Sequence, residues 1–184
     1  MKAPLLALLV LALTACQTTT EFPVTSPHYL IPVGSHLVLK QPLEIPPVAA
    51  TVRLQFGKIV SRFNSQEFEP LCVFESRIVG EAAQRIEPDS FEIIRVRRDY
   101  NSTWAQAAPP TGLIKAFASE GGSRQYYKTE LFLHSDKQPQ ILVMTCQHAW
   151  EPGLGSFDLR PLTVAEIRQA LGDYFSLQLA GVDL

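Results

Sequence analysis

The chain has 184 residues, with 16 basic and 18 acidic side chains and a formal net charge of −2. This near-neutral charge argues against a surface that wraps nucleic acid, because phosphate binding needs a concentrated basic patch. With 46% hydrophobic and 9% aromatic residues, the composition is that of a globular domain and excludes a disordered tail.

The first fifteen residues have the three-part pattern of a secretory signal. Lys2 is their only charge, and an apolar run of 11 residues extends from Ala3 to Leu13 before the small residue Ala15. A transmembrane helix needs roughly 17 to 25 apolar residues. The run is therefore predicted to be an export signal that is removed.

The residues Leu13, Thr14, Ala15 and Cys16 resemble the lipobox of bacterial lipoproteins. The resemblance implies that the Cys16 sulfur receives a diacylglyceryl group, that the signal is cut before this residue, and that the new amino terminus is acylated as well. Two or more acyl chains hold a protein stably at a membrane. The alternative is an ordinary secretory signal that ends near a cysteine.

Gln17 follows the predicted anchor. In Gram-negative lipoproteins an Asp at this position marks retention at the inner membrane, so the resemblance implies transfer to the outer membrane, facing the periplasm by default, with surface exposure left open. In a Gram-positive host the anchor would lie on the outer face of the single membrane. Residues 16–27, rich in threonine and proline, are predicted to be a flexible tether, and residues 28–184 a single domain.

Three cysteines are present. With Cys16 assigned to lipid, Cys72 and Cys146 remain, and each lies in an apolar run typical of a buried strand. We predict that they form a disulfide, because an exported domain folds in an oxidising compartment. Two buried reduced thiols are the alternative.

Alternating and continuous apolar runs predict about seven strands. Pro42, Pro46 and Pro47 predict a sheet edge or a crossing loop, because proline cannot donate to a strand ladder. The pattern fails between residues 101 and 124, which we predict to be the mobile part. The extended segments are predicted at 29–31, 37–39, 51–56, 71–79, 90–100, 126–134, 141–150 and 175–179.

One helix is predicted from Thr163 to Leu171. Thr163 and Glu166 have the spacing of a capping box, and Gly172 can end the helix. Val164, Ile167 and Leu171 form one apolar stripe that can pack on a sheet. The sequence thus predicts a mainly β fold, either an antiparallel β-sandwich or a curled, barrel-like sheet, with one C-terminal helix.

Candidate catalytic groups are few. Cys146 and His148 would share a strand face, but a catalytic thiol must be free, and Cys146 is assigned to the disulfide. Glu67, Glu69 and Glu75 are interpreted as solvated carboxylates of a strand edge. No G-x-S-x-G, H-E-x-x-H, P-loop or Rossmann pattern is present.

The remaining histidines, His28, His36 and His134, lack the spacing of a metal site. We therefore predict no catalytic residues, no metal and no cofactor.

Arg95, Arg97 and Arg98 form the most concentrated basic group. Arginine grips flat anions through two parallel hydrogen bonds, so these residues are a candidate contact for an anion or an acidic partner. The alternative is pairing with carboxylates on neighbouring strands.

Four short runs in the first half of the mature chain are similar to small, functionally uncharacterised lipoproteins of proteobacteria. This resemblance supports the envelope location and implies no activity. The runs are Gly34-Ser35, Leu43-Glu44-Ile45-Pro46-Pro47, Gln55-Phe56-Gly57 and Cys72-Val73-Phe74-Glu75.

The sequence favours a non-enzymatic, lipid-anchored accessory or structural protein of the cell envelope that contacts an envelope protein and no nucleic acid. The alternative is a binding module in which a curled sheet holds a lipid or other amphipathic ligand, with residues 101–124 as a lid. An envelope hydrolase is the third hypothesis.

Overall fold

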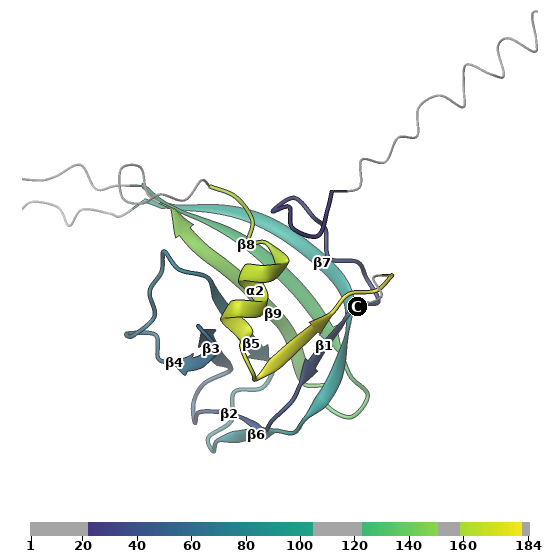
Figure 1. Cartoon of the computed structure of the whole chain (residues 1–184). Helices are drawn as coiled ribbons and strands as arrows, with labels where there is room; N and C mark the ends of the chain where they lie inside the picture. The colour runs from purple at the N-terminus through teal and green to yellow at the C-terminus, as the bar shows by residue number, and fades with distance from the viewer. Residues whose placement is uncertain (1–21, 105–122, 151–158, 182–184) are drawn as a thin grey trace, which may run out of the picture.

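The computed structural model describes residues 22–104, 123–150 and 159–181. In these ranges the chain forms ten strands and one helix (Figure 1). The strands are β1 (His36–Leu39), β2 (Leu43–Ile45), β3 (Thr51–Gln55), β4 (Lys58–Val60), β5 (Leu71–Ser76), β6 (Gln84–Ile86), β7 (Asp89–Trp104), β8 (Ser123–His134), β9 (Ile141–Trp150) and β10 (Phe175–Gln178), and the helix is α2 (Val164–Leu171).

Eight of the strands form one antiparallel sheet in the order β10-β1-β7-β8-β9-β5-β3-β4. The sheet curls into a half-barrel around α2 (Figure 1). The short strands β2 and β6 make a separate two-stranded sheet. Of the two predicted architectures, the curled sheet with one C-terminal helix is the one observed.

The concave face of the sheet is filled by side chains. Strand residues alternate between the two faces, and most of those that point inward are almost fully buried, as are the residues of the α2 stripe. Toward the end of β7 the inward face is less covered, and Tyr100 there is exposed. The phenyl ring of Phe74 lies 5.8 Å from that of Phe91 and 5.2 Å from that of Phe175, measured between centroids. The inward-facing core includes Leu37, Leu54, Phe74, Phe91, Ile93, Leu131, Met144, Phe175, Ile167 and Leu171.

Cys72 and Cys146 are directly opposed on β5 and β9, and their sulfurs form the predicted disulfide. Both residues are fully buried. The bridge joins neighbouring strands that are 74 residues apart in sequence. In the chain-entropy model, closing a loop of that length stabilises a protein by about 4.5 kcal/mol.

Helix α2 begins with the predicted capping box. The Glu166 backbone N–H donates to the Thr163 hydroxyl (3.2 Å), and the Thr163 backbone N–H donates to the Glu166 carboxylate (2.7 Å). Two nitrogens of the Arg160 guanidinium also donate to this carboxylate, at 2.8 and 2.7 Å. Burial alone would raise the pKa of Glu166, but the hydrogen bonds from Arg160 and Thr163 outweigh it and lower the pKa to about 2.

The end of α2 touches the turn between β3 and β4. Gly57 donates its N–H to the Ala170 carbonyl (3.1 Å), and both Gly57 and Gly172 have positive φ angles. A Cβ atom on Gly172 would lie 2.2 Å from the Gly57 Cα atom, which is closer than any real contact. Glycine at these positions therefore lets the helix hold the β3–β4 edge of the sheet in place.

Several predicted boundaries were wrong. Residues 29–31 are not a strand, and Leu37–Leu39 pairs with β7 and β10 instead. The strands β7 and β8 continue into the segment predicted to be irregular, so only 105–122 of that segment lies outside the described residues. The short strands β2, β4 and β6 were not predicted. Val24, inside the predicted tether, packs against the core.

Replacing both cysteines tests the role of the bridge. We expect Cys72→Ala/Cys146→Ala to lose about 2 to 5 kcal/mol of unfolding free energy, because the unfolded chain regains its loop entropy. Urea unfolding with and without reductant measures this. Reduction should destabilise the wild type and leave the variant unchanged. An identical midpoint for the oxidised wild type and the variant would contradict the prediction.

Glu166 should make stability depend on acidity. Its folded pKa lies below its ordinary value of 4.5, so its contribution is full above pH 4.5 and is lost as the pH falls toward 2. We expect Glu166→Gln to cost about 1 to 3 kcal/mol at pH 7, the value of charge-assisted hydrogen bonds. Chemical unfolding at several pH values should show the gap between wild type and variant closing below pH 4.5. A gap that stays constant down to pH 2 would exclude this role.

Candidate functional site

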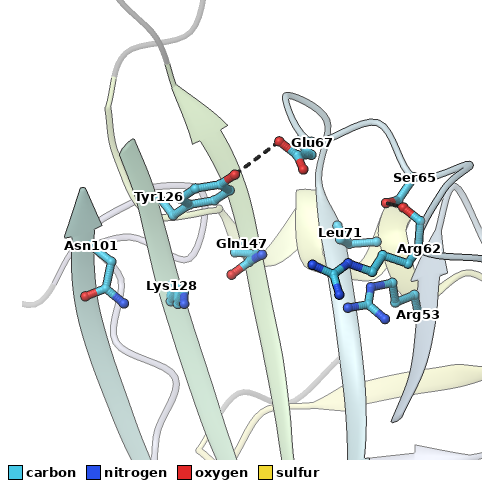
Figure 2. Close-up of a pocket in the computed structure, with 9 residues that line it drawn as sticks. All are labelled: Arg53, Arg62, Ser65, Glu67, Leu71, Asn101, Tyr126, Lys128 and Gln147. Carbon is cyan, nitrogen blue, oxygen red and sulfur yellow. Dashed lines mark hydrogen bonds between the residues drawn. The ribbon is translucent and has the colours of Figure 1, made fainter. Parts of the chain in front are cut away.

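A pocket of about 300 Å³ lies on the face of the sheet that points away from α2 (Figure 2). It is partly open to solvent, and eight of its nine lining residues are polar or charged. The residues that line it come from β3, β5, β7, β8, β9 and the loop between β4 and β5. They are Arg53, Arg62, Ser65, Glu67, Leu71, Asn101, Tyr126, Lys128 and Gln147.

Strand register brings the floor of the pocket together. Lys128 on β8 is opposite Gln147 on β9, which is opposite Leu71 on β5. Their neighbours in sequence, such as Cys72 and Thr129, are buried on the concave face. Because strand side chains alternate between faces, the same pairing that fills the core presents these three side chains to the pocket.

The loop of residues 61–70 forms one wall of the pocket. The Gln55 side chain holds it, because its Oε1 accepts the Gln66 backbone N–H (2.9 Å) and its Nε2 donates to the Gln66 carbonyl (2.8 Å). Ala149 on β9 donates its backbone N–H to the Glu67 carbonyl (2.6 Å). These bonds bury Gln55, at 2% exposure, and place Arg62 and Glu67 at the rim.

The charged side chains of the pocket are three cations, Arg53, Arg62 and Lys128, and one carboxylate, Glu67. Glu67 accepts a hydrogen bond from the Tyr126 hydroxyl (3.1 Å). Within the described residues, none of the three cationic side chains has a hydrogen-bond or ion-pair partner. The pocket therefore has an excess of two positive charges that the described part of the chain does not neutralise by contact.

One further carboxylate lies close to this group. Asp99 on β7 is opposite Lys128 in the strand register, but its Oδ1 accepts the Tyr100 backbone N–H (2.8 Å). Asp99 makes no ion pair with Lys128 in the described structure. The ammonium of Lys128 is thus available to a ligand.

Arg95 and Arg97 lie on the same outer face as the pocket. The Arg95 guanidinium stacks on the Phe132 ring, 3.7 Å from its centroid. Arg97 forms an ion pair with Glu130 on β8, and this hydrogen bond raises the pKa of Arg97 above its ordinary value. Arg97 therefore has the carboxylate partner of the pairing alternative, whereas Arg95 contacts an aromatic ring.

Arg98 lies on the opposite face of the sheet from Arg95 and Arg97. It donates to the carbonyl oxygens of His28 (3.2 Å) and Tyr29, and burial lowers its pKa from the ordinary value. The structure thus does not bring the three arginines together as one cluster. Arg98 instead attaches the segment before β1 to the concave side of β7.

His148 and Cys146 share the concave face, as predicted. The Cys146 sulfur is in the disulfide, so it is not a free thiol. His148 is 3% exposed, and its Nε2 lies 2.9 Å from the Arg160 carbonyl oxygen. Because a carbonyl can only accept, Nε2 carries the proton, and this imidazole fastens the segment before α2 to the sheet.

Of the three glutamates singled out from the sequence, Glu67 lines the pocket, whereas Glu69 and Glu75 do not. Across residues 22–104, 123–150 and 159–181, no three His, Cys, Asp or Glu side chains are grouped as ligands of a metal ion. Cys16, the predicted lipidation site, lies outside the described residues.

Sequence reasoning missed the other residues that line the pocket. Arg53, Lys128 and Gln147 are the polar positions of alternating strands, and each alone looks like an ordinary solvent-facing side chain. In the sequence each of them stands between two residues that face inward, which places it on the outer face of its strand. That the three line one pocket follows only from the pairing of strands distant in sequence.

Comparison of the chain with protein-family models, curated proteins and solved structures found no match. In the part of the chain that the structure describes, no helix has the length and apolar character needed to cross a bilayer.

Proposed function

We propose that this protein is a non-enzymatic, lipid-anchored accessory protein of the cell envelope that binds an anionic group in the outer-face pocket. The lipobox-like run ending at Cys16 and the following Gln17 support an anchor at the periplasmic side of the outer membrane. The pocket supports a binding role, because it gathers three cations without partners in the described structure.

The single observation that carries the binding proposal is that Arg53 and Arg62 line the same end of the pocket, with Lys128 farther along the same face of the sheet. Cations of a structural surface usually pair with carboxylates or spread apart, because like charges close together repel. Figure 2 shows both guanidinium groups directed toward the pocket floor at Leu71. An anion bound between them would relieve the repulsion and make charge-assisted hydrogen bonds.

An amphipathic ligand held inside the curled sheet is less well supported. The concave face is packed with residues such as Phe74, Phe91 and Leu131, each 0% exposed. A ligand there would have to displace core side chains or the helix that covers them. The polar pocket on the other face offers an open site that needs no such change.

The anchor can be tested by metabolic labelling. We expect wild-type protein expressed in cells fed labelled palmitate to incorporate the label and to fractionate with membranes. Cys16→Ser should take up no label and leave the membrane fraction, because the acceptor sulfur is lost. If the wild type carries no label, or if both proteins fractionate alike, the anchor proposal is wrong.

The pocket can be tested with pyrophosphate as a small anionic probe. We expect the purified wild-type protein to bind labelled pyrophosphate in equilibrium dialysis, and Arg53→Gln/Arg62→Gln to bind it about tenfold or more weakly, because hydrogen bonds to charged groups are lost.

The matched control is Arg85→Gln, which removes an exposed guanidinium paired with Glu87 outside the pocket. It should bind like the wild type, and circular dichroism should show that all three proteins are folded. Equal binding by the double variant and the wild type would remove the pocket from the proposal.

A further inference from the structure

The pocket is elongated across the strands. Its lining extends from Asn101 on β7 through β8, β9 and β5 to Arg53 on β3. Neighbouring strands are about 4.8 Å apart, so these four steps span roughly 19 Å. Figure 2 shows the labelled side chains arranged along this direction. A ligand that contacts both ends must therefore be extended.

The floor of the pocket from β8 to β3 has no free strand edge. The strands β8, β9, β5 and β3 each pair with a neighbour on both sides, whereas β7 beyond Glu92 pairs only with β8. An extended peptide that recognises a sheet by adding a strand needs unpaired backbone groups. The floor between β8 and β3, where most of the lining side chains lie, provides none.

The side chains that line the pocket also disfavour a ligand with an acyl chain. Leu71 is the one aliphatic side chain in the lining, and the others are amides, hydroxyls, a carboxylate and cations. Amides and hydroxyls both donate to and accept from ligand hydroxyl groups, whereas a carboxylate accepts from them. This set fits a ligand rich in hydroxyls better than an apolar one.

Charge is unevenly distributed along the pocket. Arg53 and Arg62 lie at the β3 end, and Lys128 lies between them and the neutral Asn101. Glu67, whose backbone carbonyl is bonded to Ala149 on β9, adds a carboxylate in the middle of the pocket that can accept from hydroxyls. The ligand must therefore bring negative charge opposite the two arginines and Lys128, and hydroxyls at the positions between and beyond them.

We propose that the pocket binds a short segment of an acidic glycan, with its carboxylates or phosphates at Arg53, Arg62 and Lys128 and its hydroxyls at Asn101, Gln147 and Glu67. This inference rests on the proposed anion-binding function and names the ligand class for the same site. It also explains why the same pocket contains neutral amides and an electropositive end.

Isothermal titration calorimetry on the purified protein tests the inference. The probes are hexagalacturonate, a phosphorylated mannan fragment, neutral maltohexaose, hexaglutamate and pyrophosphate. We expect at least one acidic glycan to bind about tenfold or more tightly than both maltohexaose and hexaglutamate. The glycan that binds identifies whether carboxylate or phosphate supplies the charge.

Variants test the amide positions and the arginine end of the pocket separately. Asn101→Ala/Gln147→Ala should weaken acidic-glycan binding about tenfold and leave pyrophosphate binding unchanged, whereas Arg53→Gln/Arg62→Gln should weaken both. Arg85→Gln should change neither. These substitutions are at surface positions, and circular dichroism checks that each variant is folded.

The outcomes distinguish this inference from the function on which it rests. If pyrophosphate binds but the acidic glycans bind no better than maltohexaose or hexaglutamate, the glycan assignment is overturned and the anion site stands. The same holds if Asn101→Ala/Gln147→Ala leaves glycan binding unchanged. If neither pyrophosphate nor any glycan binds, both proposals fall.

Discussion

The structure depends on the filling of the concave face of one curled sheet. An open antiparallel sheet must cover one face with apolar material, and here α2 and the inward side chains of the strands do so. The residues at the centre, among them Phe74, Phe91, Leu131 and Leu171, are fully buried. Because this face is occupied, the space available to a ligand lies on the other side of the same strands.

Adjacent residues of the same strands face the core on one side of the sheet and the pocket on the other. Cys72 and Cys146 point into the core and form the disulfide, while the adjacent Leu71 and Gln147 face the pocket. The covalent bridge thus fixes the register of β5 and β9, two of the strands that form the pocket floor. Similarly, the Gly57–Gly172 contact holds the edge of the sheet near Arg53. Stability and binding geometry therefore rest on the same interactions.

Local patterns predicted the local features of this fold. The capping box at Thr163 and Glu166, the long strand at 141–150 and the pairing of the two non-lipobox cysteines all depend on nearby residues or on simple elimination. The pairing of Leu37–Leu39 with β10 depends on chain about 140 residues away, and no local pattern records it. The pocket also depends on distant residues. Register between distant strands places Arg53 and Lys128 on one face, with β5 and β9 between them, and Gln55 positions the loop that carries Arg62.

The central claim is that the filled core leaves the outer face as the binding surface, and nuclear magnetic resonance can test it directly. Amide and side-chain shifts would be recorded while hexagalacturonate or the phosphorylated glycan is titrated into the isotope-labelled protein. The account predicts perturbations at Arg53, Asn101, Lys128 and Gln147, with the methyl groups of Leu37, Leu131 and Ile167 unchanged. Shifts concentrated on those core methyl groups, with the outer face unchanged, would contradict it.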